Sequence, residues 1–403
     1  MKAPLEGIRV LEVANWLVAP CTAALMVDMG AEAIKVEPPG GDALRTFDMK
    51  TLGYDYDFAG NYVFELDNRG KRSITIDLEK PGGPELVQRL AQDVDVFVTN
   101  LIQSRRERYR LTPEQIHAIN PTAVYASFSG YGTRGPDAAR PGFDYAAFWA
   151  RSGVMHSLTL PNSPPPLCRP GQGDHTTTLN LLAGVLAALR LRDATGEGQL
   201  VDTTLMGTGM WTVGTDLASV LIAKQQPPPH DHAAPGNPLH NAYECSDGRW
   251  VQLVMPQPDR FWAAVCKMLG LQEWATDTRY DSITKRREQT RDLTLGIAER
   301  FLQHDFAYWE KQLDAFGLIW APVSTLPDLI DDPQVREMEI FAEIDHPELG
   351  RFETMNTPFQ IAGADISVRG PAPGPGQHTA EVLQEAGLDD DEVATLAADG
   401  VFG

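Results

Sequence analysis

The 403-residue sequence has few cysteines, and no two of them are spaced as a Cys-x-x-Cys pair. The four are Cys21, Cys168, Cys245 and Cys266. This spacing excludes a zinc ribbon, and so few cysteines in so long a chain exclude a disulfide-rich secreted scaffold. The pattern is typical of a protein that folds in a reducing compartment, and we expect a cytoplasmic location.

Long apolar runs are also missing. The longest, residues 179–189, is shorter than the stretch of about 20 residues that a transmembrane helix needs, so it predicts a buried helix. Charged residues Lys2 and Glu6 precede any apolar run at the N-terminus, so no secretory signal peptide is predicted. We therefore expect no membrane partner.

Basic residues are in deficit, with 34 Lys and Arg against 55 Asp and Glu, and the formal net charge is −21. A charge of this sign repels nucleic acid and anionic membranes at long range, so neither is an expected partner. The 43% of hydrophobic and 22% of charged residues are ordinary for a folded globular protein. The length predicts two or three domains.

The motifs of the common nucleotide cofactors and metals are absent as well. The turn that follows the first expected strand, residues 15–20, lacks the glycines that bring a dinucleotide close to the backbone, and the chain has no Walker loop. NAD, FAD and ATP are therefore disfavoured. His230 and His232 lie in a proline-rich connector, where solvated side chains are more common than a metal site. We predict no metal and no prosthetic group.

Strand-like and helix-like segments alternate along the first 200 residues. Strands are expected at 8–13, 33–37, 73–78, 94–98, 123–128 and 199–205, and helices at 20–30, 83–91, from 112 onward with a capping box at Thr112 and Gln115, and at 175–192. Most of these strands are apolar on both faces. This alternation predicts an α/β fold with a mostly parallel, helix-covered, Rossmann-like sheet.

The composition changes after residue 200, which predicts further domains. We expect a large α/β domain at 1–200, a linker at 201–225, a smaller α+β domain at 226–329, and a return to the large domain at 330–403. The small domain should contain a hairpin within 241–255 that turns at 246–248. It should also contain amphipathic helices at 261–269 and 291–302, and a strand pair is expected at 341–344 and 351–355.

One acidic residue stands out at the start of the long expected helix. Asp174 follows Gly171 and Gly173, immediately before an apolar segment. An aspartate here is a favoured helix cap and complements the helix dipole, so the residues alone favour capping over catalysis. Catalysis stays open, because glycines without Cβ atoms would let a reacting carbonyl approach the carboxylate and the backbone N–H groups.

Basic residues gather at two places despite the acidic balance. Residues 68–72 read Asn-Arg-Gly-Lys-Arg before one strand, and Arg105, Arg106, Arg108 and Arg110 follow another. A solvated charged face explains both groups. The alternative is a pocket for phosphate groups at the end of the sheet where open α/β folds bind ligands.

Several motifs along most of the chain together resemble one enzyme family. They are residues 4–12 (PLEGIRVLE), 29–42 (MGAEAIKVEPPGGD), 68–74 (NRGKRSI), Asn100, 129–132 (SGYG), 173–174 (GD) and 195–199 (TGEGQ). On these residues the chain resembles the class III CoA-transferases, the group of formyl-CoA transferase, carnitine CoA-transferase and 2-hydroxyacyl-CoA transferases. The α-methylacyl-CoA racemase is a relative of this group.

The resemblance implies that Asp174 is the nucleophile, which reverses the preference for capping. It implies that CoA is transferred from an acyl-CoA to a carboxylic acid through an anhydride and an aspartyl-CoA thioester. Acyl-CoA and a small acid are then the substrates, and an interlocked homodimer is expected. The CoA site carried over by position consists of Asn15, Leu17, Val18, Ile76, Leu78, Asn100, Leu101, Arg108, Asp144 and Tyr145.

Three positions depart from the family pattern. Leu17 replaces a glutamine that touches the acyl group in formyl-CoA transferase, and Pro38 and Phe143 replace basic CoA contacts. Lys71, Arg72 or Arg106 are candidates to replace these contacts, and a less polar acyl group would suit Leu17 and Phe143. The identity of the acyl donor and the acid, and whether CoA moves between molecules or within one, stay open.

Two alternatives to transfer remain. The racemase uses a histidine at the position of Phe143 as a base, and that base is missing here, although His156 or His175 could replace it. A CoA-binding protein without turnover is the other alternative, and the presence of Asp174 between its glycine and the apolar helix argues against it.

Overall fold

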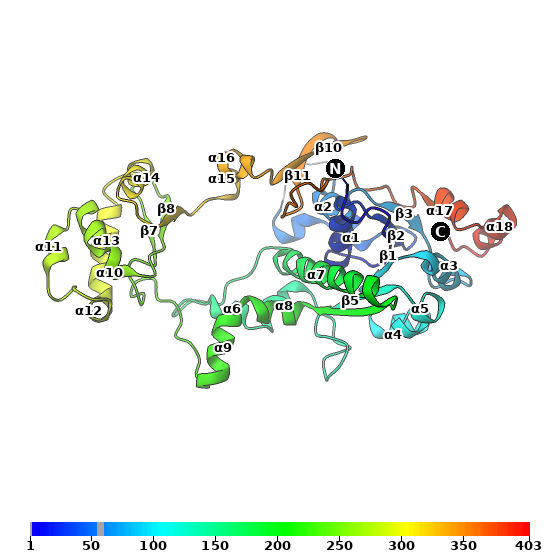
Figure 1. Cartoon of the computed structure of the whole chain (residues 1–403), viewed down its shortest axis with the longest axis horizontal. Coiled ribbons are helices and arrows are strands. Elements are labelled where there is room, and N and C mark those ends of the chain that lie inside the picture. The colour runs from blue at the N-terminus through cyan, green and yellow to red at the C-terminus, as the bar shows by residue number, and fades with distance from the viewer. Residues whose placement is uncertain (1, 55–59) are drawn as a thin grey trace. The chain divides into compact units, whose positions relative to one another are not determined.

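Six parallel strands form the central sheet of the computed structural model, which describes residues 2–54 and 60–403 (Figure 1). The strand order is β3-β2-β1-β4-β5-β6. The strands are β1 (Arg9–Val13), β2 (Glu32–Glu37), β3 (Arg72–Thr75), β4 (Val96–Thr99), β5 (Val124–Ser129) and β6 (Gln199–Thr204). The predicted parallel α/β sheet is confirmed. The order reverses between β1 and β4, and open α/β sheets bind ligands beyond the carboxyl ends of strands at such a point.

Apolar side chains cover both faces of the sheet, as the strand sequences predict. On one face, Val10, Val96 and Ala126 pack with helices α1 (Val18–Asp28) and α7 (Gln172–Thr195). On the other face, the strand residues pack with α3 (Gly83–Leu90), α5 (Pro113–Ile119) and α17 (Thr379–Glu385). Thr112 and Gln115 form the predicted capping box. The third strand ends at Thr75 rather than residue 78, because its chain leaves the sheet after pairing with β2.

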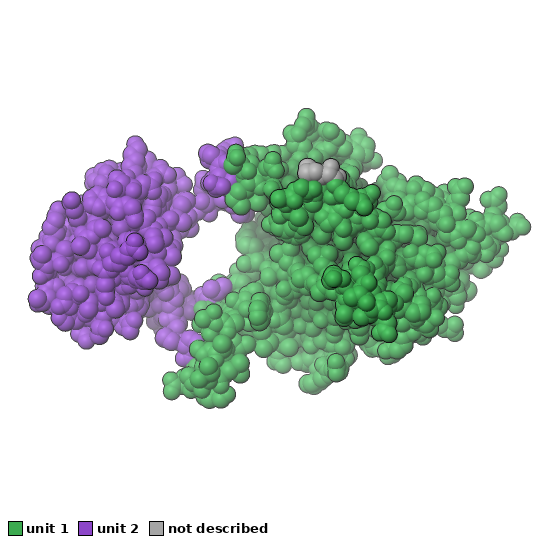
Figure 2. Space-filling model, in the orientation of Figure 1, with its two compact units in different colours: residues 1–157, 166–225, 336–403 green, residues 158–165, 226–335 purple. Residues whose placement is uncertain are grey.

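The chain divides into two compact units, which Figure 2 colours separately. Unit 1 comprises Met1–Ser157, Pro166–Gln225 and Arg336–Gly403, and unit 2 comprises Leu158–Pro165 and Gln226–Val335. Residues 201–225, expected to be a linker, instead end β6 and form α8 (Leu205–Thr212) and α9 (Gly214–Ala223) within unit 1. Thr204 accepts a hydrogen bond from the Gly207 N–H and so starts α8. No proline interrupts this stretch.

Unit 2 contains the expected hairpin, because β7 (Ala242–Glu244) and β8 (Trp250–Leu253) pair in antiparallel fashion. β9 (Trp320–Pro322) extends it to three strands. The helices around it are α10 (Pro258–Met268), α11 (Gln272–Thr276), α12 (Ile283–Glu288), α13 (Thr290–Phe301), α14 (Phe306–Ala315) and α15 (Leu326–Ile330). The expected amphipathic helices are thus α10 and α13. Leu158–Pro165 joins this unit from far upstream, which the sequence analysis did not anticipate.

The remaining elements belong to unit 1. They are η1 (Ala43–Thr46), η2 (Met49–Leu52), α2 (Tyr62–Asn68), η3 (Ala91–Asp93), α4 (Gln103–Arg108), η4 (Asp144–Ala150), α6 (Val154–Ser157), α16 (Pro333–Glu337), β10 (Phe341–His346), β11 (Gly350–Met355) and α18 (Asp390–Ala398). α16 is the exception, because it begins in unit 2 at Pro333 and ends in unit 1 at Glu337. β10 and β11 form the predicted strand pair. In the part of the chain that the structure describes, no helix is both long and apolar enough to cross a membrane.

A buried ionic network joins the carboxyl ends of β1 and β2 to α2. One oxygen of Glu12 lies 2.6 Å from Lys35 Nζ, and the other lies 2.6 Å from Lys71 Nζ. Lys35 also lies 2.8 Å from Asp42, and all four side chains are fully buried. Burial opposes the charge on Lys35, but Glu12 and Asp42 outweigh it and raise the Lys35 pKa.

Lys71 connects this network to two helices. Its ammonium group donates to the carbonyl of Pro20 in α1 at 2.8 Å, to the carbonyl of Asp67 in α2 at 3.0 Å, and to Asn68 Oδ1 at 2.9 Å. Burial lowers the Lys71 pKa to about 8, since Glu12 offsets only part of the cost of desolvation. Glu12 therefore neutralises two buried cations and fixes the segments that follow β1 and precede β3.

We expect Glu12→Gln to destabilise unit 1 by about 3–5 kcal/mol, because it leaves two buried lysines without their shared counter-ion. Urea unfolding followed by circular dichroism measures the loss. The matched control is Glu343→Gln, which breaks an exposed ion pair with Arg351 and should cost less than about 1 kcal/mol. Equal, small losses in the two variants would contradict the role given to Glu12.

Candidate active site

Helix α7 begins beside the loop that follows β1, and Asp174 lies in its first turn. The N-cap position is Gly171, with φ of 74°, and no side chain of α7 itself caps the helix. Asp174 is therefore not the cap that the residues alone favoured. A positive φ at the N-cap explains the glycine at 171, because L side chains rarely adopt this conformation.

The environment of Asp174 disfavours its ionised form. Its half-buried carboxyl group has a pKa raised to about 8, first because burial removes water and second because Asp144 places a like charge nearby. Asp67 adds to the rise, and the neighbouring His175 opposes it. A carboxylate this costly to ionise inside a protein is typical of a functional group rather than a structural one.

Asp144 starts η4 and faces the same helix terminus. Its Oδ1 accepts a hydrogen bond from the Tyr145 N–H at 2.6 Å, and the N–H groups of Gly171 and Gly173 stabilise its ionised form. Burial nevertheless raises its pKa. Its Oδ2 is buried and has no hydrogen-bond partner among the residues that the structure describes. Asp144 thus places a buried carboxyl group beside the first turn of α7.

The loop after β1 is held from two sides. The Asn100 side chain, at the end of β4, accepts from the Asn15 N–H at 3.2 Å and donates to the Asn15 carbonyl at 2.6 Å. The Trp16 N–H donates to Asp42 at 3.2 Å, and Trp16 has φ of 69°. A bulky residue in the left-handed region is strained and persists where surrounding contacts fix it. Asn100 therefore positions the loop in this structure.

Leu17 follows in the same loop and reaches the start of α7. A Cβ atom placed on Gly171 would lie 3.1 Å from Leu17 Cδ2. On the other side, Trp16 contacts Phe47 and Phe143 edge to face, with ring centroids 5.7 and 5.9 Å apart. Leu17 and these three rings give this end of the site an apolar wall.

A cavity of about 230 Å³ lies at the carboxyl ends of the strands, near the switch point of the sheet. Four of the sequence-predicted CoA residues line it, namely Asn15, Ile76, Leu78 and Leu101. Arg105 and Tyr109 line it as well, and neither was among the predicted contacts. Only the cluster of arginines in the sequence pointed to Arg105.

The other predicted CoA residues lie elsewhere. Val18 is 1% exposed and packs in the core between α1 and α7. Arg108 is exposed and forms an ion pair with Glu79, which also accepts a hydrogen bond from the Tyr109 hydroxyl group. Tyr145 is half-buried next to Asp144. The structure therefore gathers the predicted residues into two groups, one at the cavity and one at the start of α7.

The basic motif at 68–72 is divided between the interior and the surface. Arg69 is 1% exposed and binds Asp28 at 2.6 Å, and Lys71 belongs to the buried network, so both serve the fold. Arg72 pairs at the surface with Glu381 and Glu385 of α17. Arg106 is buried. That Arg72 or Arg106 replaces the family contacts missing at Pro38 and Phe143 stays a prediction.

The glycine at 173 has a structural reason different from the one that the sequence suggested. A Cβ atom there would lie 2.6 Å from the ring of Phe148. Gly173 is required because α7 packs closely on η4, whereas close approach of a ligand was the expected reason.

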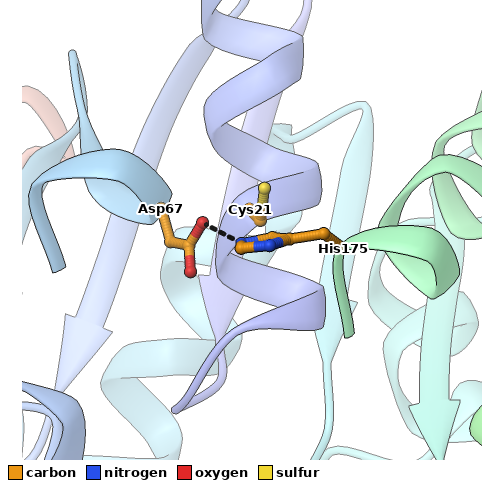
Figure 3. A group of neighbouring side chains, drawn as sticks. All are labelled: Cys21, Asp67 and His175. Atoms are coloured by element: carbon orange, nitrogen blue, oxygen red, sulfur yellow. Dashed lines mark hydrogen bonds and ion pairs between the residues drawn. The ribbon is translucent and has the colours of Figure 1, made fainter. Parts of the chain in front are cut away.

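His175, Asp67 and Cys21 form a cluster beside Asp174 (Figure 3). His175 Nε2 lies 3.1 Å from Asp67 Oδ1, and the Asp67 side chain is fully buried. Burial opposes protonation of His175, but the Asp67 carboxylate outweighs it, so that the His175 pKa is raised. Asp67 precedes His175 by 108 residues. No local pattern in the sequence could have paired them.

The donor atoms of these three side chains lie within 4.8 Å of one another, a spacing that a metal could bridge. Without a metal, burial and the nearby Asp67 raise the Cys21 pKa well above its ordinary value, so the thiol is neutral. Arg69 adds a positive charge close to the same atoms. The cluster is better described as a hydrogen-bonded group that fixes the His175 ring.

Comparison with known proteins identifies the family. Residues 5–379 match the family described as CoA-transferase family III. The chain belongs to this family. It is therefore an enzyme that transfers CoA between an acyl-CoA and an acid. The extent of the match includes every predicted site residue.

Individual relatives are similar to this protein over nearly the full length of the chain. The (R)-2-hydroxy-4-methylpentanoate CoA-transferase of Clostridioides difficile is 32% identical over 96% of this chain and 97% of its own length. The succinyl-CoA:glutarate CoA-transferase of Homo sapiens is 30% identical over 99% and 90%. A crystal structure of a CAIB/BAIF family protein from Brucella suis superposes with a TM-score of 0.84 and 28% identity, covering 96% of this chain and all of that one.

With Asp174 as the predicted nucleophile, we expect kcat/KM for acyl-CoA to rise with pH through a midpoint near 8, because the carboxyl group must lose its proton to attack. Asp144→Asn removes the like charge and should move the midpoint down by about one pH unit. The measurement is the exchange rate at acyl-CoA concentrations well below KM from pH 5.5 to 9.5, which reports the free enzyme. Asp391→Asn, in the first turn of α18, is the control. An unchanged midpoint in Asp144→Asn would contradict the coupling.

Proposed function

We propose that this enzyme transfers CoA through covalent intermediates on Asp174. The Asp174 carboxylate attacks the thioester carbon of the acyl-CoA, the C–S bond breaks, and an anhydride and the CoA thiolate form. The thiolate attacks the Asp174 carbonyl carbon of the anhydride, which expels the first acid and leaves an aspartyl-CoA thioester. An incoming carboxylate reverses both steps and leaves as the new acyl-CoA. Charge and protons balance without a metal or a redox partner.

One observation carries this proposal. Asp174 lies in the first turn of α7 without capping the helix, and burial and Asp144 make its ionised form costly. When an ionised carboxylate is poorly stabilised in the free enzyme, its conversion to a neutral ester-like bond is more favourable in free energy than for a well-stabilised carboxylate. The positive end of the α7 dipole lies next to the same group and favours negative charge that develops on a tetrahedral intermediate.

The two groups of residues suggest how the CoA molecule is bound. The cavity lined by Ile76, Leu78 and Leu101 suits the adenine ring, with Arg105 and Arg108 at the surface for phosphate groups. By the family pattern Asp144 lies beside the pantetheine arm, and its Oδ2 is enclosed by protein in the free enzyme. The thioester would then reach Asp174 past Leu17. We place Asn100 in a positioning role, because it holds the loop at Asn15.

For the acid acceptor we favour a 2-hydroxy acid with an apolar side chain. Leu17, Trp16, Phe47 and Phe143 supply an apolar wall, which suits a branched or aromatic group better than formate or oxalate. Two relatives carry names of this kind, the (R)-2-hydroxy-4-methylpentanoate CoA-transferase and a cinnamoyl-CoA:phenyllactate CoA-transferase of Clostridium sporogenes that is 28% identical. Racemase chemistry is disfavoured, because Phe143 has no group that can move a proton.

We further propose that the protein is a homodimer and cytoplasmic. Helix α9 supports the dimer, because Leu221 is 65% and Ile222 86% exposed and no residue of this apolar helix is buried. An exposed apolar surface of this kind on a soluble protein usually marks an interface with another chain. The four cysteines are unpaired, which supports a reducing compartment.

Hydroxylamine added with an acyl-CoA should convert Asp174 to its hydroxamate, because hydroxylamine attacks the activated aspartyl carbonyl. Peptide mass spectrometry locates the modification. Asp174→Ala should lower the exchange of CoA among a panel of acids by about 1,000-fold or more. Asp391→Ala, a first-turn aspartate of another helix, should keep full activity. Modification at another residue, or full activity of Asp174→Ala, would exclude this nucleophile.

Ile222→Glu should change the protein from dimer to monomer, because it places a charge within the apolar surface of α9. Size-exclusion chromatography with light scattering measures the mass. Ile222→Val keeps the surface apolar and should remain dimeric. A monomeric wild-type protein would show that α9 has another partner.

A further inference from the structure

The ring of His175 borders the part of the site where the acyl group would react. A Cβ atom placed on Gly171 would lie 3.3 Å from His175 Cε1, 3.5 Å from its Nδ1, and 3.1 Å from Leu17 Cδ2. His175 also follows Asp174 directly in the first turn of α7. Its side chain is 39% exposed, so a small ligand can reach the ring.

Asp67 fixes this ring from the buried side, as Figure 3 shows. With Nε2 bound to Asp67, Nδ1 is the nitrogen near Gly171 and Leu17. Asp67 is itself fixed, because its backbone carbonyl accepts a hydrogen bond from Lys71 of the buried network. The position of His175 therefore depends on contacts that reach back to Glu12.

The charges around His175 come from four elements. Asp67 of α2, Asp174 of α7 and Asp144 of η4 all favour its protonated form, and burial opposes it. Cys21 of α1 lies against Asp67 as a neutral thiol, and the nearby Arg69 is bound to Asp28. In the aspartyl-CoA intermediate Asp174 carries no charge, and Asp67 and Asp144 remain as the carboxylates that favour the protonated form of His175.

An acid acceptor faces an electrostatic problem here. It must bring a negative charge next to Asp144 and Asp67 while Asp174 is held as the uncharged aspartyl-CoA thioester, in a chain whose net charge is −21. The buried lysines and Arg69 are bound to acidic partners, whereas Arg169 is exposed and keeps its charge where it lies over the ring of Tyr54. Among the charges that act most strongly on Asp174, that of His175 is the one that favours an anion.

We propose that His175, held by Asp67, binds the carboxylate of the acid acceptor through Nδ1 and positions it to attack the aspartyl-CoA thioester. The inference rests on the proposed function, since it takes Asp174 as the nucleophile. His175 keeps its proton throughout. The acceptor oxygen bonds to the Asp174 carbonyl carbon while the C–S bond breaks, and the imidazolium stabilises the bound anion without taking part in proton transfer.

The first test compares the change in KM for the acid with the change in KM for acyl-CoA in His175→Gln. The KM for the acid should rise about tenfold or more, because a charged hydrogen bond is lost, while the KM for acyl-CoA changes less than about twofold. Hydroxylamine trapping at Asp174 needs no acid and should persist. His117→Gln, a half-buried histidine that contacts the carbonyl of Ala123, is the matched control and should leave both KM values unchanged.

The second test uses charge and pH. In wild-type enzyme the KM for the acid should rise with pH as His175 loses its proton, at a midpoint above the ordinary value of 6.5. Asp67→Asn should move this midpoint down, with acid affinity recovered near pH 5.5. His175→Lys keeps a cation and should bind the acid better than His175→Gln at pH 8.

Three results would overturn the proposal. They are an unchanged acid KM in a folded His175→Gln, an equal loss of acyl-CoA affinity, or α-deuterium exchange that disappears in this variant, which would make His175 a base. The absence of trapping at Asp174 in wild-type enzyme would instead contradict the proposed function. The two failures are therefore distinguishable.

Discussion

The site depends on one buried carboxylate, Glu12, which neutralises two lysines at once. Lys71 has Glu12 as its acidic partner, and Lys35 pairs with both Glu12 and Asp42; desolvation of an unpaired ammonium costs several kcal/mol. Through Lys35 the network reaches Asp42, which holds the Trp16 N–H, and through Lys71 it reaches Asp67. The loop after β1 and the ring of His175 both border the candidate site at the start of α7. The charges of this one network thus hold both in place.

The sequence predicted that the strands of the sheet are parallel, but it did not predict their order or register. Alternating apolar segments predicted the sheet, and the capping box at Thr112 predicted the start of α5, since both are local signals. The apolar stretch at 205–223 gave no such signal, and it formed helices where a linker was expected. Helix α9 has no buried residue, so no pattern of buried and exposed positions in the sequence distinguishes it from a connector.

The family motifs predicted candidate site residues by their position in the sequence. They did not predict ion pairs between residues that are far apart in the sequence. Asp174 and the cavity residues follow from position. The pairing of Asp67 with His175, and the burial of Lys71 and Arg69, depend on contacts between segments far apart in sequence. Burial decides how the basic motif is interpreted. A cation with a fully buried acidic partner stabilises the fold, whereas the same residue in solvent would indicate a ligand site.

The division of unit 1 around unit 2 has a consequence for synthesis. Asp28, which binds Arg69, also accepts a hydrogen bond from Thr357 at 2.8 Å, across a separation of 329 residues. At about 5–20 residues per second, the ribosome needs roughly 15–65 s to supply that second partner. During this interval the half-built sheet exposes the surface that α17 will cover. A chaperone that shelters the nascent N-terminal half would therefore limit aggregation more than one that acts after release.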